Sequence, residues 1–111
     1  MEQRRTRRFT LQLPLSVTRS GADRVTLPGY TKNISSSGVL FTTSREPDLR
    51  GPIEYIITLN VDGAQPVNLR CIGKVLRSDR VASDSDPQLP AFQIAVTLER
   101  YEFVRERSAA G

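Results

Sequence analysis

The sequence contains no histidine, no tryptophan and a single cysteine. Without histidine the chain has no His-based metal site, no Ser-His catalytic pair and no imidazole pH switch. Cys71 alone excludes an intramolecular disulfide and is compatible with a reducing compartment. No stretch resembles a signal peptide or approaches the length of a membrane span. We therefore expect a soluble, cytoplasmic protein without membrane insertion.

Groupings of side chains that would support catalysis are also missing. Carboxylates are plentiful, but nothing in the pattern pairs two of them or sets a base beside a nucleophile. Aromatic residues are few, four Phe and three Tyr, which argues against a base-stacking surface made of the protein's own rings. We expect a protein that is not an enzyme and that carries no cofactor.

The positive charge is concentrated at one end of the chain. The formal net charge is +4, and residues 1–8 alone contribute +3, from four Arg and one Glu. The remaining residues carry 12 basic and 11 acidic side chains, which is close to neutral. A near-neutral body with a basic arm suits a small anionic ligand or an acidic partner better than a long duplex, which needs a broad basic face. Nucleic acid is therefore an unfavoured partner.

The apolar pattern predicts short strands separated by turns. Seven glycines and seven prolines are scattered through the 111 residues, a length that suits one domain with one core. Strand-like segments, alternating or apolar, cover 9–17, 24–32, 38–43, 53–59, 67–77 and 92–98. Residues 78–90 are polar and predict a loop. Residues 99–107 are rich in helix formers and predict one short helix.

These elements predict an all-β fold, a six-stranded antiparallel barrel whose short C-terminal α-helix covers one opening. The domain organisation that follows is a basic arm over 1–8, the barrel with its helix over 9–107, and a tail over 108–111. Pro14 predicts an edge or a local irregularity in the first strand. Pro28-Gly29 predicts a bend or bulge before Asn33, and Gly73 a bend or a close backbone approach.

Two polar motifs stand next to predicted strands. Arg4-x-x-x-Arg8 precedes the first strand, and Asn33-x-Ser35-x-x-Gly38 follows the second. Alone, the second motif is a β-turn, with a glycine that tolerates positive φ, and the first is a solvated tail. Together, in this order and with this strand count, they resemble the PilZ family. Members of that family are six-stranded barrels that act as receptors for the bacterial second messenger cyclic di-GMP.

The resemblance implies specific ligand contacts. Arg4, Arg8, Asn33 and Ser35 would contact cyclic di-GMP, and Gly38 would shape the turn. Arg suits this ligand because its planar fork binds phosphate or the guanine edge bidentately and its flat face stacks on a base.

The other two arginines of the arm have less definite roles. Arg5, like Arg7, would either touch phosphate or add to the positive field. The function implied is that of a stand-alone receptor that relays the signal to a partner protein. Because the arm begins next to Met1, we expect no upstream domain, so that output would pass through the barrel surface, the C-terminal helix or a separate protein.

Two alternatives remain open at the level of sequence. One is a barrel of the same fold that does not bind nucleotide and works as a protein-interaction adaptor. The other is a small nucleic-acid-binding barrel with a basic arm, which predicts a steep salt dependence of binding.

Overall fold

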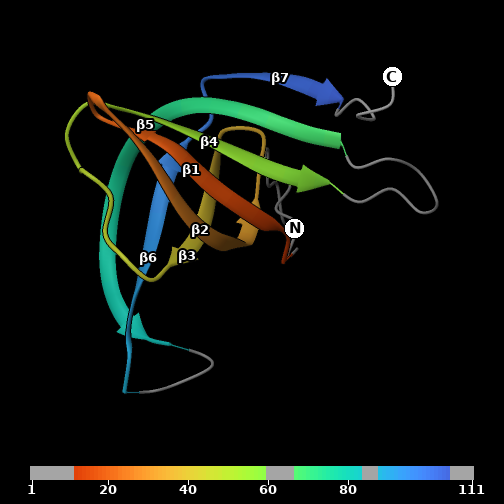
Figure 1. Ribbon diagram of the computed structural model, residues 1–111. Helices are drawn as coiled ribbons and strands as arrows, with labels where there is room; N and C mark the ends of the chain where they lie inside the picture. Colours follow the sequence, from red (N-terminus) through yellow and green to blue (C-terminus); the bar gives the residue numbers. More distant parts are fainter. Residues whose placement is uncertain (1–11, 60–66, 84–87, 106–111) are drawn as a thin grey trace, which may run out of the picture.

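The computed structural model describes residues 12–59, 67–83 and 88–105, and every regular element within them is a strand (Figure 1). The strands are β1 (Pro14–Ser20), β2 (Asp23–Ile34), β3 (Gly38–Thr43), β4 (Pro52–Leu59), β5 (Val67–Ala82), β6 (Pro90–Thr97) and β7 (Arg100–Arg105). In this part of the chain no helix is long and apolar enough to cross a membrane.

Six of the strands close into an antiparallel barrel. The strand order is β4-β1-β2-β3-β6-β5, and β5 pairs in turn with β4, which closes the ring. Every one of these pairings is antiparallel. Closure gives each of the six strands a neighbouring strand on both sides, in place of the two open edges of a flat sheet. The predicted six-stranded barrel is confirmed.

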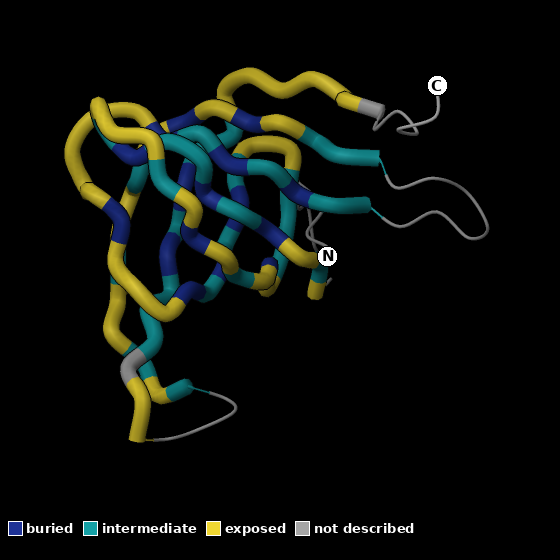
Figure 2. The backbone as a smooth tube through the Cα atoms, in the orientation of Figure 1, coloured by how far each residue is buried: buried dark blue, intermediate teal, exposed yellow. Residues whose placement is uncertain are grey.

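The core fills the inside of this ring because apolar residues alternate with polar ones along each strand. Phe41 of β3 and Tyr55 of β4 lie at its centre, with ring centroids 6.1 Å apart. All six barrel strands contribute buried apolar side chains, which are Leu15, Val17, Leu27, Val39, Phe41, Ile53, Tyr55, Ile57, Cys71, Ile94 and Val96. Figure 2 shows these buried positions spaced along the barrel strands. The predicted core position of Cys71 is thus confirmed.

The predicted C-terminal helix is wrong for Arg100–Arg105, which form β7. β7 pairs antiparallel with β5, from Ile72 opposite Arg100 to Val67 opposite Arg105. This half of β5 has β4 on its other side, while β6 pairs only with the half that begins at Val75. The first half of β5 would therefore have an unpaired edge, and its free N–H and C=O groups favour a strand over a helix. Residues 106 and 107 lie outside the described part.

The loop predicted over residues 78–90 is also corrected. β5 continues to Ala82 and pairs with β6 as far as Pro90, so only the segment between those two residues connects the strands. This β5–β6 hairpin extends beyond the barrel (Figure 1). Beyond the barrel neither face of the hairpin meets the core, so its residues need not alternate between apolar and polar.

Of the three backbone irregularities predicted, the one at Pro14 is wrong. β1 pairs with both β2 and β4, and its bulge lies between Val17 and Arg19. Pro14 is the first residue of β1, where a missing N–H is tolerated. Pro28 and Gly29 remain within β2, and the bulge comes just after them, between Thr31 and Asn33. At Gly73 an added Cβ would lie 1.9 Å from the carbonyl oxygen of Thr97, which confirms the predicted close approach.

Candidate ligand-binding site

The turn between β2 and β3 holds three of the predicted site residues. Asn33 lies in the last part of β2, opposite Leu40 of β3, and Ser35 and Gly38 flank the turn itself. Asn33 and Ser35 are half-buried. Arg4, Arg5 and Arg8 lie outside the described residues, as does the rest of the predicted arm. The structure therefore shows the turn half of the predicted site.

The Ser35 hydroxyl holds this turn together. Its Oγ accepts hydrogen bonds from the backbone N–H groups of Gly38, at 3.2 Å, and of Ser37, at 3.3 Å. It also lies 3.2 Å from the Gly38 carbonyl oxygen, to which it donates. The Ser35 N–H donates to the same carbonyl at 2.9 Å. A hydroxyl has one proton and two lone pairs, so these contacts use its full capacity. A contact of Ser35 with a ligand stays a prediction.

Gly38 is required for space and not for an unusual backbone angle. Of the glycines in the described residues, only Gly21 and Gly51 have positive φ. A Cβ on Gly38 would lie 2.7 Å from the carbonyl oxygen of Val96 in β6. The positive-φ explanation is therefore wrong for Gly38. The glycine allows β3 to approach β6 closely at the point where the turn ends.

The chain leading into β1 is attached next to this turn. Leu13 and Thr31 form two hydrogen bonds of 2.9 Å, one from the Leu13 N–H to Thr31 Oγ1 and one from the Thr31 N–H to the Leu13 carbonyl. Thr31 is buried and lies two residues before Asn33. The described chain therefore enters the barrel beside the Asn33 end of β2. No sequence signal indicates this attachment, because a single threonine in a strand is common.

A junction at the end of β6 connects the turn to β5 and β7. The Leu98 N–H donates to the Ser37 carbonyl at 2.9 Å, and the Glu99 N–H donates to the Ile72 carbonyl at 3.0 Å. Thr97 Oγ1 accepts from the Lys74 N–H at 2.8 Å. Ser37 thus ties the turn to the segment that leads into β7.

Tyr55 anchors the same junction from inside the barrel. Its hydroxyl donates to the Thr97 carbonyl at 3.0 Å. Burial raises the pKa of Tyr55 far above its ordinary value, and the neighbouring Cys71 thiol adds to the rise. The hydroxyl therefore stays protonated and remains a donor. Through this bond the core fixes the position of β6 beneath the turn.

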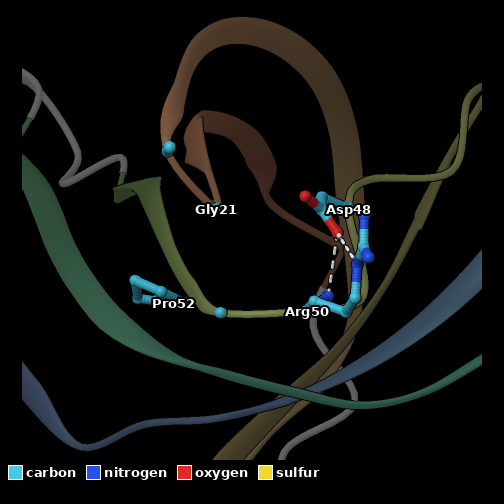
Figure 3. A pocket seen from close by; sticks show the side chains of 6 residues that line it. Gly21, Asp48, Arg50 and Pro52 are labelled. Carbon is cyan, nitrogen blue, oxygen red and sulfur yellow. Dashed lines mark hydrogen bonds and ion pairs between the residues drawn. The ribbon is translucent and has the colours of Figure 1, made fainter.

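An opening in the described part lies away from this turn, at the β1–β2 turn and the loop before β4 (Figure 3). Its volume is about 470 Å³, and its lining includes Gly21, Asp48, Arg50 and Pro52. Asp48 already pairs with Arg50, since its Oδ1 accepts from the Arg50 N–H at 2.9 Å and lies 3.6 Å from Nε. The arginine is thus neutralised, and nothing in this opening selects an anion. It lies at the opposite end of β2 from Asn33.

Metal-binding groups are not seen in the described ranges. No cluster of three or more His, Cys, Asp or Glu side chains there could hold an ion. Burial raises the pKa of the Cys71 thiol to about 12, so this side chain is a protonated core residue at neutral pH. What the described part of the site offers is a neutral, hydrogen-bonding turn on the barrel rim.

Comparison with known families shows to which family the chain belongs. The family model of the PilZ domain matches residues 2–102, and the chain belongs to this family. The matched range spans the residues of both motifs, Arg4 to Arg8 and Asn33 to Gly38. Searches of curated proteins and of solved structures gave no match. PilZ domains are ligand-binding receptor domains of the cyclic di-GMP system, so the resemblance seen in the sequence is confirmed.

Proposed function

We propose that the chain is a receptor for cyclic di-GMP, which binds where the segment carrying Arg4 and Arg8 meets the turn from Asn33 to Gly38. Membership of the PilZ family supports the identity of the ligand. The observation that carries the location is the pairing of Leu13 with Thr31, because it attaches the arginine segment beside this turn.

The covalent length of the chain is consistent with a joint site. Arg8 precedes Leu13 by five residues, and an extended chain spans at most about 3.6 Å per residue, so the Arg8 backbone lies within about 18 Å of Leu13. Asn33 lies two residues beyond Thr31, or roughly 7 Å along the strand. The side chains of Arg8 and Asn33 can therefore reach one ligand while the barrel stays unchanged.

The chemistry of the two halves is complementary. Cyclic di-GMP carries two phosphates and two guanines, and guanidinium groups bind both phosphate oxygens and the guanine edge. Arginine planes also supply the stacking that a chain with few aromatic residues otherwise lacks. The half-buried Asn33 amide adds a neutral donor and acceptor on a fixed strand end. In this proposal, binding holds the arginine segment against the barrel through charge-assisted hydrogen bonds.

The same geometry supports a relay to a partner protein. The turn is hydrogen-bonded through Ser37 to Leu98, and the next residue, Glu99, is bonded to β5. A ligand that alters the turn would thus alter the start of β7, which lies on the outside of the barrel (Figure 1). In this proposal the partner recognises the ligand-bound rim and its neighbouring surface.

Calorimetry with cyclic di-GMP tests the site. We expect the wild-type chain to bind and Arg8→Ala to lose affinity by about 10- to 100-fold, the effect of removing hydrogen bonds to charged groups. Arg24→Ala is the matched control, because Arg24 is exposed at the far end of β2 and its loss changes the charge equally. It should bind like wild type.

Three results would count against the proposal: no binding by wild type, equal binding by Arg8→Ala, or an equal loss in Arg24→Ala. A competition experiment distinguishes this proposal from the nucleic-acid-binding alternative. A plain oligonucleotide should fail to displace cyclic di-GMP, and the affinity should lack the steep salt dependence of phosphate-backbone binding.

A further inference from the structure

β7 is the one strand of the described sheet with only one neighbour. It ends the strand order and pairs with β5 alone, while each barrel strand has partners on both sides. Figure 1 shows it outside the barrel, with its second edge facing away from the other strands. In an antiparallel strand every second residue directs its N–H and C=O to each edge. The outer edge of β7 therefore presents backbone groups that no other described strand pairs, and such groups template the addition of another strand.

The side chains of β7 leave this edge open. Tyr101 is 60% exposed and Phe103 64% exposed, and their rings pack edge to face with centroids 6.2 Å apart. Val104 on the opposite face is 40% exposed. Figure 2 shows the exposed class along the strand. A large apolar surface on a free edge marks a site of protein association.

Features that usually block strand addition are weak here. The strand contains no proline, and its register with β5 runs without a bulge. Glu102 is the acidic residue in its middle, and it forms an ion pair with Arg70, whose Nη1 lies 3.6 Å from Glu102 Oε2. Arg70 also lies 3.3 Å from Glu54 of β4, so it holds β4, β5 and β7 together on one face. β7 is thus an edge without proline or bulge whose central carboxylate has a cationic partner.

The sequence of β7 is self-complementary in one register. When two copies pair antiparallel about a two-fold axis, one residue must face its own copy. Five residues of each strand are paired only when the two-fold axis passes at residue 102 or at residue 103. A centre at Glu102 would set two carboxylates opposite each other, which destabilises the pair. A centre at Phe103 instead sets ring against ring and places Glu102 opposite Val104 of the second copy.

We propose that β7 is the interface through which two copies of this chain associate, by antiparallel pairing with Phe103 facing Phe103 of the second copy. The pairing joins the two barrels by a continuous strand ladder. It also brings the four rings of Tyr101 and Phe103 from both copies onto one face, where aromatic cross-strand pairs add stability. The association needs no nucleotide, and its failure would leave the proposed receptor site untouched.

Sedimentation equilibrium of the full chain, without nucleotide, measures the association. We expect wild type to shift from monomer to twice the monomer mass as concentration rises. Phe103→Lys and Phe103→Glu should each raise the dissociation constant by about tenfold or more, because like charges then face each other. Leu89→Lys is the control, since Leu89 is 56% exposed on the distant β5–β6 hairpin, and it should associate like wild type.

Mixing the two charged variants makes the test specific to the register. An equimolar mixture of Phe103→Lys and Phe103→Glu should regain association, because lysine then faces glutamate across the axis. Regain also shows that each variant is folded. Wild type that stays monomeric overturns the proposal. Unchanged association in Phe103→Lys, or no regain in the mixture, overturns it as well.

Discussion

Two tyrosines flank Cys71 on the same face of the sheet and have opposite environments. Tyr55 of β4 pairs with Cys71 on one side and is fully buried, whereas Tyr101 of β7 pairs with it on the other side and is 60% exposed. Both point to the face that forms the barrel interior, because directly paired residues share a face. What differs is closure: β4 belongs to the ring and β7 lies outside it. Burial here is decided by topology and not by the strand pattern.

Replacing each tyrosine by alanine should give the largest difference in stability between the two regions. Tyr55→Ala removes a central ring and the hydrogen bond to Thr97, and we expect a loss of about 3–5 kcal/mol in the free energy of unfolding. Tyr101→Ala removes an exposed ring and should cost about 0.5 kcal/mol or less. Urea denaturation of both variants measures this. Similar losses would mean that β7 is as well packed as the barrel.

Substitution of the glycines beneath the junction should give the next largest effect. Gly73→Ala would place Cβ 1.9 Å from the Thr97 carbonyl oxygen, so β6 must move away from β5. Overpacking of this kind costs about 1–3 kcal/mol. Gly38→Ala, with a distance of 2.7 Å to the Val96 carbonyl, should cost less and should disturb the turn locally. Thermal melting of the two variants measures this order. Equal losses of stability, or a larger loss in Gly38→Ala than in Gly73→Ala, would contradict it.

The smallest expected effect concerns the ion pairs on the outer face. Partial burial raises the pKa of Glu54, but hydrogen bonds from Thr18 and Arg70 outweigh it and hold the pKa below its ordinary value of 4.5. The folded state therefore gains stability from the ionised carboxylate above pH 4.5, and this gain is lost as pH falls through the lowered pKa. In Glu54→Gln, the free energy of unfolding should therefore fall less between neutral and acid pH than it does in wild type. The difference should be about 1 kcal/mol or less.

Glu102→Gln is the control for that measurement. Its carboxylate also pairs with Arg70, at 3.6 Å, but the side chain is 63% exposed. We expect the urea midpoint of this variant to follow wild type between neutral and acid pH. Two results would contradict this difference between the outer-face pairs. One is a loss of stability in acid that is as steep in Glu54→Gln as in wild type, and the other is an equal reduction of that loss in Glu102→Gln.

The barrel strands were predictable because the core side of each strand alternates regularly. Ile53, Tyr55 and Ile57 are buried as their spacing predicts. β7 was mistaken for a helix because Val104 follows Phe103 and the polar residues are good helix formers. The reason for a strand is the edge of β5, which no local pattern contains. The same is true of residues 78–82, where strand pairing continues after the core ends.

The candidate site shows the same division. The turn from Asn33 to Gly38 was predictable, because serine, asparagine and glycine favour turns for local reasons. Its connections were not, because they join residues far apart in the chain. Leu13 meets Thr31, and Ser37 meets Leu98, only after the strands have paired. The reason for Gly38 likewise lies in β6, at Val96.

The position of β6 also matters while the chain is being synthesised. β6 is the last strand of the ring along the chain, and it inserts between β3 and β5. Until residues up to Thr97 have left the ribosome, β3 and β5 each lack a neighbour and the inside of the unfinished ring faces solvent. Such edges and apolar surfaces are the sites at which nascent chains aggregate or bind chaperones. A stalled or truncated chain lacking β6 should therefore be a chaperone client, however well its first five strands pair.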